Sequence, residues 1–110
     1  MADFSIKAHD RLPSIQADLA NAGLPAPLAS ATSVRFVMRL AAGGVAPKVD
    51  RAATIVDAAL GTVRYDWLPA DTDTPGVYQA EWAVLYGTLP QTYPTSTYHS
   101  IEVVSDLDGV

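Results

Sequence analysis

The chain has 110 residues, a formal net charge of −5 and no cysteine. This length fits one domain, since single domains cluster at about 100–150 residues. Without cysteine, neither a disulfide framework nor a cysteine-based zinc site can form. The seven lysine and arginine residues are scattered, whereas a surface that binds phosphates needs them clustered. We therefore expect no nucleic-acid partner.

Charged residues make up only 17% of the sequence, compared with about 25% in ordinary globular domains. Such a domain exposes either apolar surface that a partner covers or mainly alanine, which costs little when exposed. No apolar run approaches the ~20 residues that cross a bilayer. Residues 1–10 lack the basic and apolar regions of a secretory leader. We expect neither a membrane partner nor export by a leader of the chain's own.

Seven short segments alternate apolar and polar side chains, a pattern typical of strands with one buried face. Proline and glycine between them predict turns and irregular loops, including an extended 24–28 and an uncharged 41–47. Segments 15–24 and 52–60 also tolerate a helix, but both alternate acceptably as strands. In chain order, the expected strands are 4–8, 14–19, 33–40, 52–57, 63–67, 78–86 and 99–104.

About seven strands with turn signals every ~8–12 residues predict an all-β fold, specifically an immunoglobulin-like antiparallel β-sandwich. We assign this domain to residues 1–104 and a polar C-terminal tail to residues 105–110.

Tyr78 precedes Ala80 by two positions, which is the spacing of a tyrosine corner with alanine in place of the cysteine. Its hydroxyl is expected to bond across the corner and stabilise the fold. The expected aromatic core is Phe36, Trp67, Tyr78 and Trp82.

The sequence contains little that points to catalysis or metal binding. His9 and His99 are far apart in the sequence and do not form a ligand pattern. The run from Asp71 to Asp73 resembles the start of a calcium loop, but Pro75 interrupts it and the closing glutamate is missing. No nucleophile motif is present, and a domain this small seldom builds a deep cleft. We therefore predict a non-enzyme without cofactor or metal.

Tyr86, Tyr93 and Tyr98 lie near expected loops, and exposed aromatic side chains in a row can stack on sugars. An alternative function is therefore a carbohydrate-binding module for host-surface glycans, with these three tyrosines as its contacts. The same residues also suit a protein interface, because tyrosine is enriched there.

Several segments, taken in order, resemble the immunoglobulin-like domain at the start of phage baseplate upper proteins, and similar domains occur as short stand-alone tailed-phage proteins. The resemblance covers nearly the whole chain. It is carried by Phe4-Ser-Ile-Lys-Ala-His-Asp-Arg-Leu-Pro13, Ala31-Thr-Ser-Val-Arg-Phe-Val-Met-Arg39, Gly61-Thr-Val-Arg-Tyr-Asp-Trp67, Asp71-Thr-Asp-Thr-Pro-Gly-Val-Tyr-Gln-Ala-Glu-Trp82, Tyr93-Pro94 and Ile101-Glu-Val103.

The resemblance implies a non-enzymatic structural protein of a tailed-phage virion. Its implied place is the tail tip, baseplate or head–tail region, with a capsid decoration protein as a variant. The implied partners are tail, baseplate or capsid subunits, in multiple copies within a symmetric assembly that forms in the host cytoplasm. Baseplate upper proteins also have long C-terminal regions that trimerise or hold receptor-binding proteins. This chain stops at Val110, so those roles are not carried over.

We expect docking through apolar loops and the two termini, because covering an uncharged loop with another subunit has a small free-energy cost. The loops are residues 40–47 and the extended segment 24–28. The candidate docking residues are Leu24, Leu28, Leu40, Ala42 and Val45.

Overall fold

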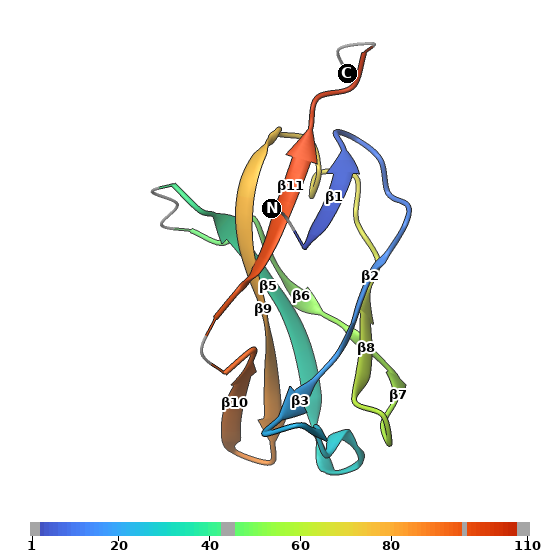
Figure 1. Ribbon diagram of the computed structural model, residues 1–110, viewed down its shortest axis with the longest axis vertical. Helices are drawn as coiled ribbons and strands as arrows, with labels where there is room; N and C mark the ends of the chain where they lie inside the picture. The colour runs from blue at the N-terminus through green and yellow to red at the C-terminus, as the bar shows by residue number, and fades with distance from the viewer. Residues whose placement is uncertain (1–2, 43–45, 96, 108–110) are drawn as a thin grey trace.

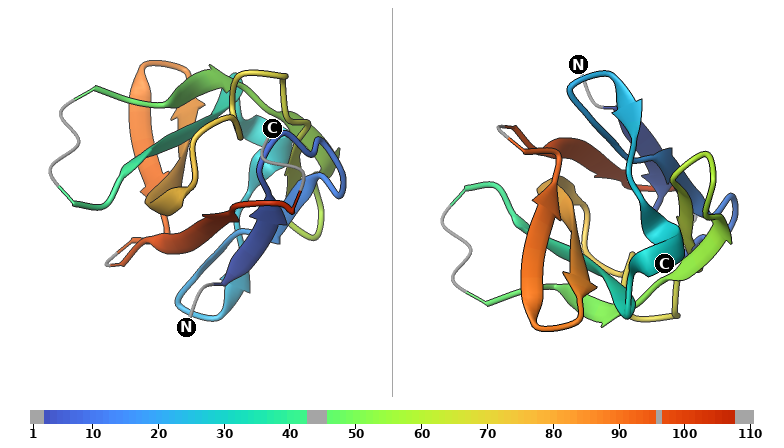
Figure 2. Two further views of the ribbon diagram at one scale, coloured as in Figure 1. Left: turned by 90° about the horizontal axis from the view of Figure 1, so that it is seen from above. Right: turned by 90° about the horizontal axis from the view of Figure 1, so that it is seen from below.

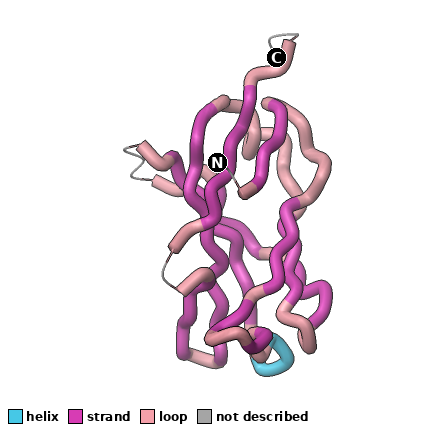
Figure 3. Tube along the Cα trace, viewed as in Figure 1, coloured by secondary structure: helices cyan, strands magenta, loops and turns pink. Residues whose placement is uncertain are grey.

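The computed structural model describes residues 3–42, 46–95 and 97–107, which form strands and one short 3-10 helix (Figure 3). The 3-10 helix η1 covers Leu28–Ser30. The strands are β1 (Phe4–Lys7), β2 (Ile15–Asp18), β3 (Ala20–Asn21), β4 (Leu24–Pro25), β5 (Ser33–Leu40), β6 (Val49–Ala52), β7 (Thr54–Asp57), β8 (Thr62–Tyr65), β9 (Gly76–Tyr86), β10 (Leu89–Tyr93) and β11 (His99–Val104).

The strands build two sheets that pack face to face (Figures 1 and 2). The larger sheet has the order β1-β11-β9-β5-β6, and β10 pairs with the C-terminal half of β9. The smaller sheet has the order β2-β8-β7, and β3 and β4 form a separate hairpin. The described residues extend over 44 × 26 × 24 Å.

This connectivity is that of an immunoglobulin-like β-sandwich, as the alternation predicted. In that fold, strands B, E and D form one sheet and strands C, F and G form the other. Here β2, β8 and β7 correspond to strands B, E and D, and β5, β9 and β11 correspond to strands C, F and G. One edge differs from the prediction, because β1 pairs with β11 in parallel rather than antiparallel.

Each of the seven expected segments contains a strand, but β6, β10 and the β3–β4 hairpin were not predicted. In β6 only Val49 is buried, so its period-two signal is weak. In β10 the sequence contains Pro90, which argues against a central strand. Pro90 is tolerated because β10 is an edge strand that pairs only with β9. β9 thus pairs with β11 along one half and with β10 along the other.

The core is centred on aromatic rings from both sheets. Phe36 of β5 stacks on Tyr65 of β8, with ring centroids 4.9 Å apart. It also meets Trp82 of its own sheet at 4.8 Å and the edge of Trp67 at 5.7 Å. The predicted core residues Phe36, Trp67, Tyr78 and Trp82 are all at most 2% exposed, which confirms their burial.

Tyr78 forms the expected corner contact. Its hydroxyl donates a hydrogen bond to the carbonyl oxygen of Thr74 at 2.7 Å. The bond joins the start of β9 to the loop that precedes it, so Tyr78 has a structural role.

Gly61 brings three backbone segments together before β8. Its φ of +73° belongs to the left-handed region that glycine favours. A Cβ at this position would lie 2.5 Å from the carbonyl oxygen of Leu19 and 3.1 Å from the amide nitrogen of Ala26. The Gly61 carbonyl accepts a hydrogen bond from the Leu19 amide at 2.8 Å. Glycine is therefore required here by both conformation and space.

We predict that Gly61→Ala destabilises the fold more than Gly23→Ala. Both positions have positive φ, but a Cβ at Gly23 would meet nothing within 4 Å. Each alanine costs about 1–2 kcal/mol for the left-handed conformation, and Gly61→Ala adds about 1–3 kcal/mol for the steric overlap. Urea unfolding of both variants measures the difference. Equal losses would show that the close approach at Gly61 contributes nothing.

Candidate functional site

The outer face of the larger sheet is open to solvent along its whole length. Alternation directs Phe36 and Trp82 inward, so their neighbours in β5 and β9 point outward. The outer face consists of Ser5, Lys7, Ser33, Arg35, Val37, Arg39, Asp50, Ala52, Val77, Gln79, Glu81, Ala83, Leu85, Pro90, Thr92, Ser100, Glu102 and Val104.

Near its centre, this face contains a hollow of about 170 Å³, lined by Val37, Arg39, Gln79, Glu81 and Tyr98. The strand register places Val37 opposite Glu81 and Arg39 opposite Gln79. Val37 is half-buried, and Tyr98 is 57% exposed just before β11 begins. The hollow therefore combines an aliphatic side chain, an exposed aromatic ring and polar groups of both charges.

Arg39 and Glu81, the two charged residues that line the hollow, have no partner within the described residues. By contrast, Arg35 on the same strand pairs with Asp50 of β6 at 2.6 Å. The ion pairs of the described chain are those of Arg35, Lys48, Arg51 and Arg64. The Arg39 guanidinium and the Glu81 carboxylate are thus available to an external group.

The charges of the outer face sum to zero. It carries three cationic side chains and three anionic ones, which are Lys7, Arg35, Arg39, Asp50, Glu81 and Glu102. Since the whole sequence has a net charge of −5, the rest of the chain carries all of it (−5 − 0 = −5). The outer face is therefore a neutral surface on an acidic molecule.

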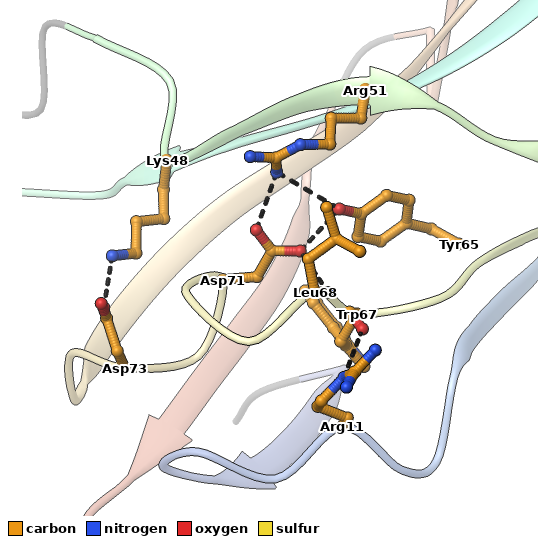
Figure 4. Close-up of polar contacts among 8 residues, drawn as sticks. All are labelled: Arg11, Lys48, Arg51, Tyr65, Trp67, Leu68, Asp71 and Asp73. Atoms are coloured by element: carbon orange, nitrogen blue, oxygen red, sulfur yellow. Dashed lines mark hydrogen bonds and ion pairs between the residues drawn. The ribbon is translucent and has the colours of Figure 1, made fainter.

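A second polar cluster is centred on Asp71, which is 1% exposed (Figure 4). Its carboxylate accepts hydrogen bonds from the Tyr65 hydroxyl at 2.5 Å and from the Leu68 amide at 2.8 Å, and pairs with Arg51 at 2.8 Å. Burial, followed by the hydrogen bond to Asp71, raises the pKa of Tyr65 to about 12. The phenol thus stays protonated and serves as a donor.

This Asp71 cluster fastens the loop after β8 and is structural. Nearby, the Arg11 side chain donates to the Trp67 carbonyl at 3.1 Å, and the Trp67 indole donates to the Pro13 carbonyl at 3.0 Å. The segment that resembled a calcium loop has other partners, since Asp71 binds within the fold and Asp73 pairs with Lys48. In residues 3–42, 46–95 and 97–107, no group of three His, Asp or Glu side chains is placed to hold a metal ion.

The predicted docking residues do not form one surface. Leu24 is 69% exposed and Leu40 is 40% exposed, and Ala42 is also exposed. Leu28 is buried at 2% exposure, so its prediction as a surface residue is wrong. The reason is that η1 turns this part of the supposedly extended segment into the core. Val45 lies outside the described residues.

The three predicted glycan contacts do not form an exposed row. Tyr93 is buried at 1% exposure, because β10 pairs it with Trp82 and directs its ring inward. Tyr86 is half-buried, and its hydroxyl lies 3.0 Å from that of Tyr93. Of the three, Tyr98 alone is exposed. The prediction of a tyrosine platform is therefore wrong.

Neither histidine lines the hollow. His9 is exposed in the turn after β1, whereas His99 is half-buried with its ring 6.5 Å from that of Trp82. Burial lowers the pKa of His99. No helix in the described part of the chain has the length and apolar character needed to cross a membrane.

Sequence reasoning missed the hollow, although alternation within the expected strands 33–40 and 78–86 directs Arg39, Gln79 and Glu81 away from the core. The available signal was the presence of outward charges at mid-strand in a chain with few charges. Comparison with family models and with curated proteins gives no match for this chain.

We predict that Asp71→Ala lowers the free energy of unfolding by about 3 kcal/mol, because it leaves the buried Tyr65 hydroxyl and the partly buried Leu68 amide without an acceptor. Asp73→Ala is the matched control, since it removes an exposed carboxylate from the same loop and should leave stability nearly unchanged. Chemical denaturation of both variants tests this. Similar stability of the two variants would contradict the structural role of the Asp71 cluster.

Proposed function

We propose that this chain is a non-enzymatic docking module of a tailed-phage virion, which joins the tail tip, baseplate or head–tail region through the outer face of its larger sheet. Capsid decoration is a variant of the same role. The resemblance supplies the virion context. The observation that carries the docking role is the outer face itself, which is open, neutral in net charge and partly aliphatic.

The side chains of this face suit contact with another protein. Val77 is 49% exposed and Leu85 is 38% exposed, at two different levels of β9. Between them lie the hollow and Tyr98. Interface cores are depleted in charged residues but enriched in arginine and aromatic side chains, and Arg39 and Tyr98 supply both types. Covering this face therefore buries apolar area and provides polar groups for orientation.

Residues 40–47, the loop that was expected to dock, connect β5 to β6 of the same sheet. The Ala41 amide donates to the Val77 carbonyl at 2.9 Å, so the chain leaves β5 at the level of Val77. The described residues on both sides of the β5–β6 connection project away from the body (Figure 2). Ala42 is exposed just beyond the end of β5, whereas Leu40 lies opposite Tyr78 on the inner side of the sheet and does not belong to the outer face. Repetition in a symmetric particle strengthens weak contacts of this kind.

A second candidate function is the binding of host-surface glycans, and the hollow beside Tyr98 favours it. One exposed ring can stack on a sugar, while Arg39, Gln79 and Glu81 offer donors and acceptors for its hydroxyls. A glycan array separates the two functions. Binding that Tyr98→Ala abolishes would support the glycan function, and an array without any bound glycan would eliminate it.

For the docking function, we predict that Val77→Asp prevents incorporation into particles whereas Val56→Asp does not. Val56 is the matched control, because it is 47% exposed and lies on β7 of the smaller sheet. A new carboxylate on the outer face must be desolvated when the partner binds. Immunoblotting of purified particles measures incorporation. Normal incorporation of Val77→Asp, or absence of the unmodified chain from particles, would contradict the proposal.

A further inference from the structure

The two unpaired charges of the hollow are arranged as a self-complementary pair. Val37 faces Glu81 and Arg39 faces Gln79 in adjacent strands, so the four side chains form a block. Arg39 and Glu81 occupy one diagonal, while Val37 and Gln79 occupy the other. Long side chains at diagonal positions can reach each other, yet no ion pair joins Arg39 to Glu81 in the described chain.

We propose that a second copy of this chain covers the outer face, with Arg39 of each copy paired to Glu81 of the other. This inference rests on the proposed docking function for the choice of surface and adds the identity of the occupant. Contacts across a two-fold axis are reciprocal, so each pair occurs twice. If the two-fold axis lies in the interface along the Val37–Gln79 diagonal, rotation about it exchanges the positions of Arg39 and Glu81. Arg39 of each copy then lies over Glu81 of the other copy.

Charge favours this face over the rest of the surface for self-association. Two copies with a net charge of −5 each repel one another. The outer face carries none of that net charge, so two copies that meet through it avoid most of the repulsion. Arg35 and Asp50 are paired within each copy, and Lys7 and Glu102 lie on β1 and β11 toward one edge of the sheet, so Arg39 and Glu81 are the unpaired charges near the centre of the face.

The size of the face is also adequate. The 38 residues of its six strands, at ~3.3 Å per residue and ~4.8 Å between strands, give a face of roughly 600 Å² per copy. Stable interfaces cover about 600–1,000 Å² per partner, so the face reaches the lower end of this range. The hollow of about 170 Å³ can also receive a side chain from the opposing copy.

The experiment is analytical ultracentrifugation of the purified chain over a concentration series, with charge-exchange variants. We expect the unmodified chain to dimerise. Arg39→Glu or Glu81→Arg alone should weaken dimerisation by roughly tenfold or more, because each places like charges together twice. The double variant Arg39→Glu/Glu81→Arg should restore it to within about threefold, since opposite charges meet again. Arg64→Glu, which makes the same change of net charge as Arg39→Glu but on the smaller sheet, should have little effect.

Circular dichroism of each variant verifies that it is folded. An unmodified chain that stays monomeric at every concentration would overturn the inference, as would a double variant that remains as weak as the single ones. If the chain is monomeric but Val77→Asp still prevents incorporation into particles, another virion protein occupies the face, and the docking function stands without the dimer. If the chain dimerises as described but is absent from particles, the dimer stands and the docking function fails.

Discussion

The packing of Phe36 between the two sheets is the contact on which the rest of the structure depends. Its ring stacks on Tyr65 of the smaller sheet and lies against Trp82 of its own sheet. Because successive side chains in a strand alternate sides, burying Phe36 and Trp82 forces Val37, Arg39 and Glu81 to the outside. The core therefore determines which positions of β5 and β9 lie on the outer face.

The hydrogen bonds of the corner after β8 have a complementary role. Asp71 binds groups from β6, from β8 and from its own loop, while Tyr78 holds the start of β9 to Thr74. These contacts fix where β9 begins and hence its register with β5. That register places Arg39 beside Gln79 and Val37 beside Glu81. Asp71, which lies in the segment that resembled the start of a calcium loop, thus helps to set the strand register on which the hollow depends.

The sequence predicted the sandwich well, because alternation reports directly which side of a strand is buried. Phe36, Trp67, Tyr78 and Trp82 could be assigned to the core on that basis. The failures concern residues whose burial depends on tertiary pairing. Leu28 is buried by one short turn in a proline-rich segment, and Tyr93 by an edge strand that contains a proline.

The hollow could not be predicted for a related reason. Its walls come from β5, β9 and the residue before β11, so its position depends on the mutual register of three strands. Local patterns do not contain that register. They did show that the outward residues of β5 and β9 include charges.

We propose that the outer face of the larger sheet is the surface covered on assembly. Hydroxyl-radical footprinting of the free chain and of the chain within purified particles tests this most directly. We expect Val77, Leu85 and Tyr98 to be protected in particles, while Val56 and Leu60 on the other side remain reactive. Unchanged reactivity of the first group, with protection of the second, would contradict the claim.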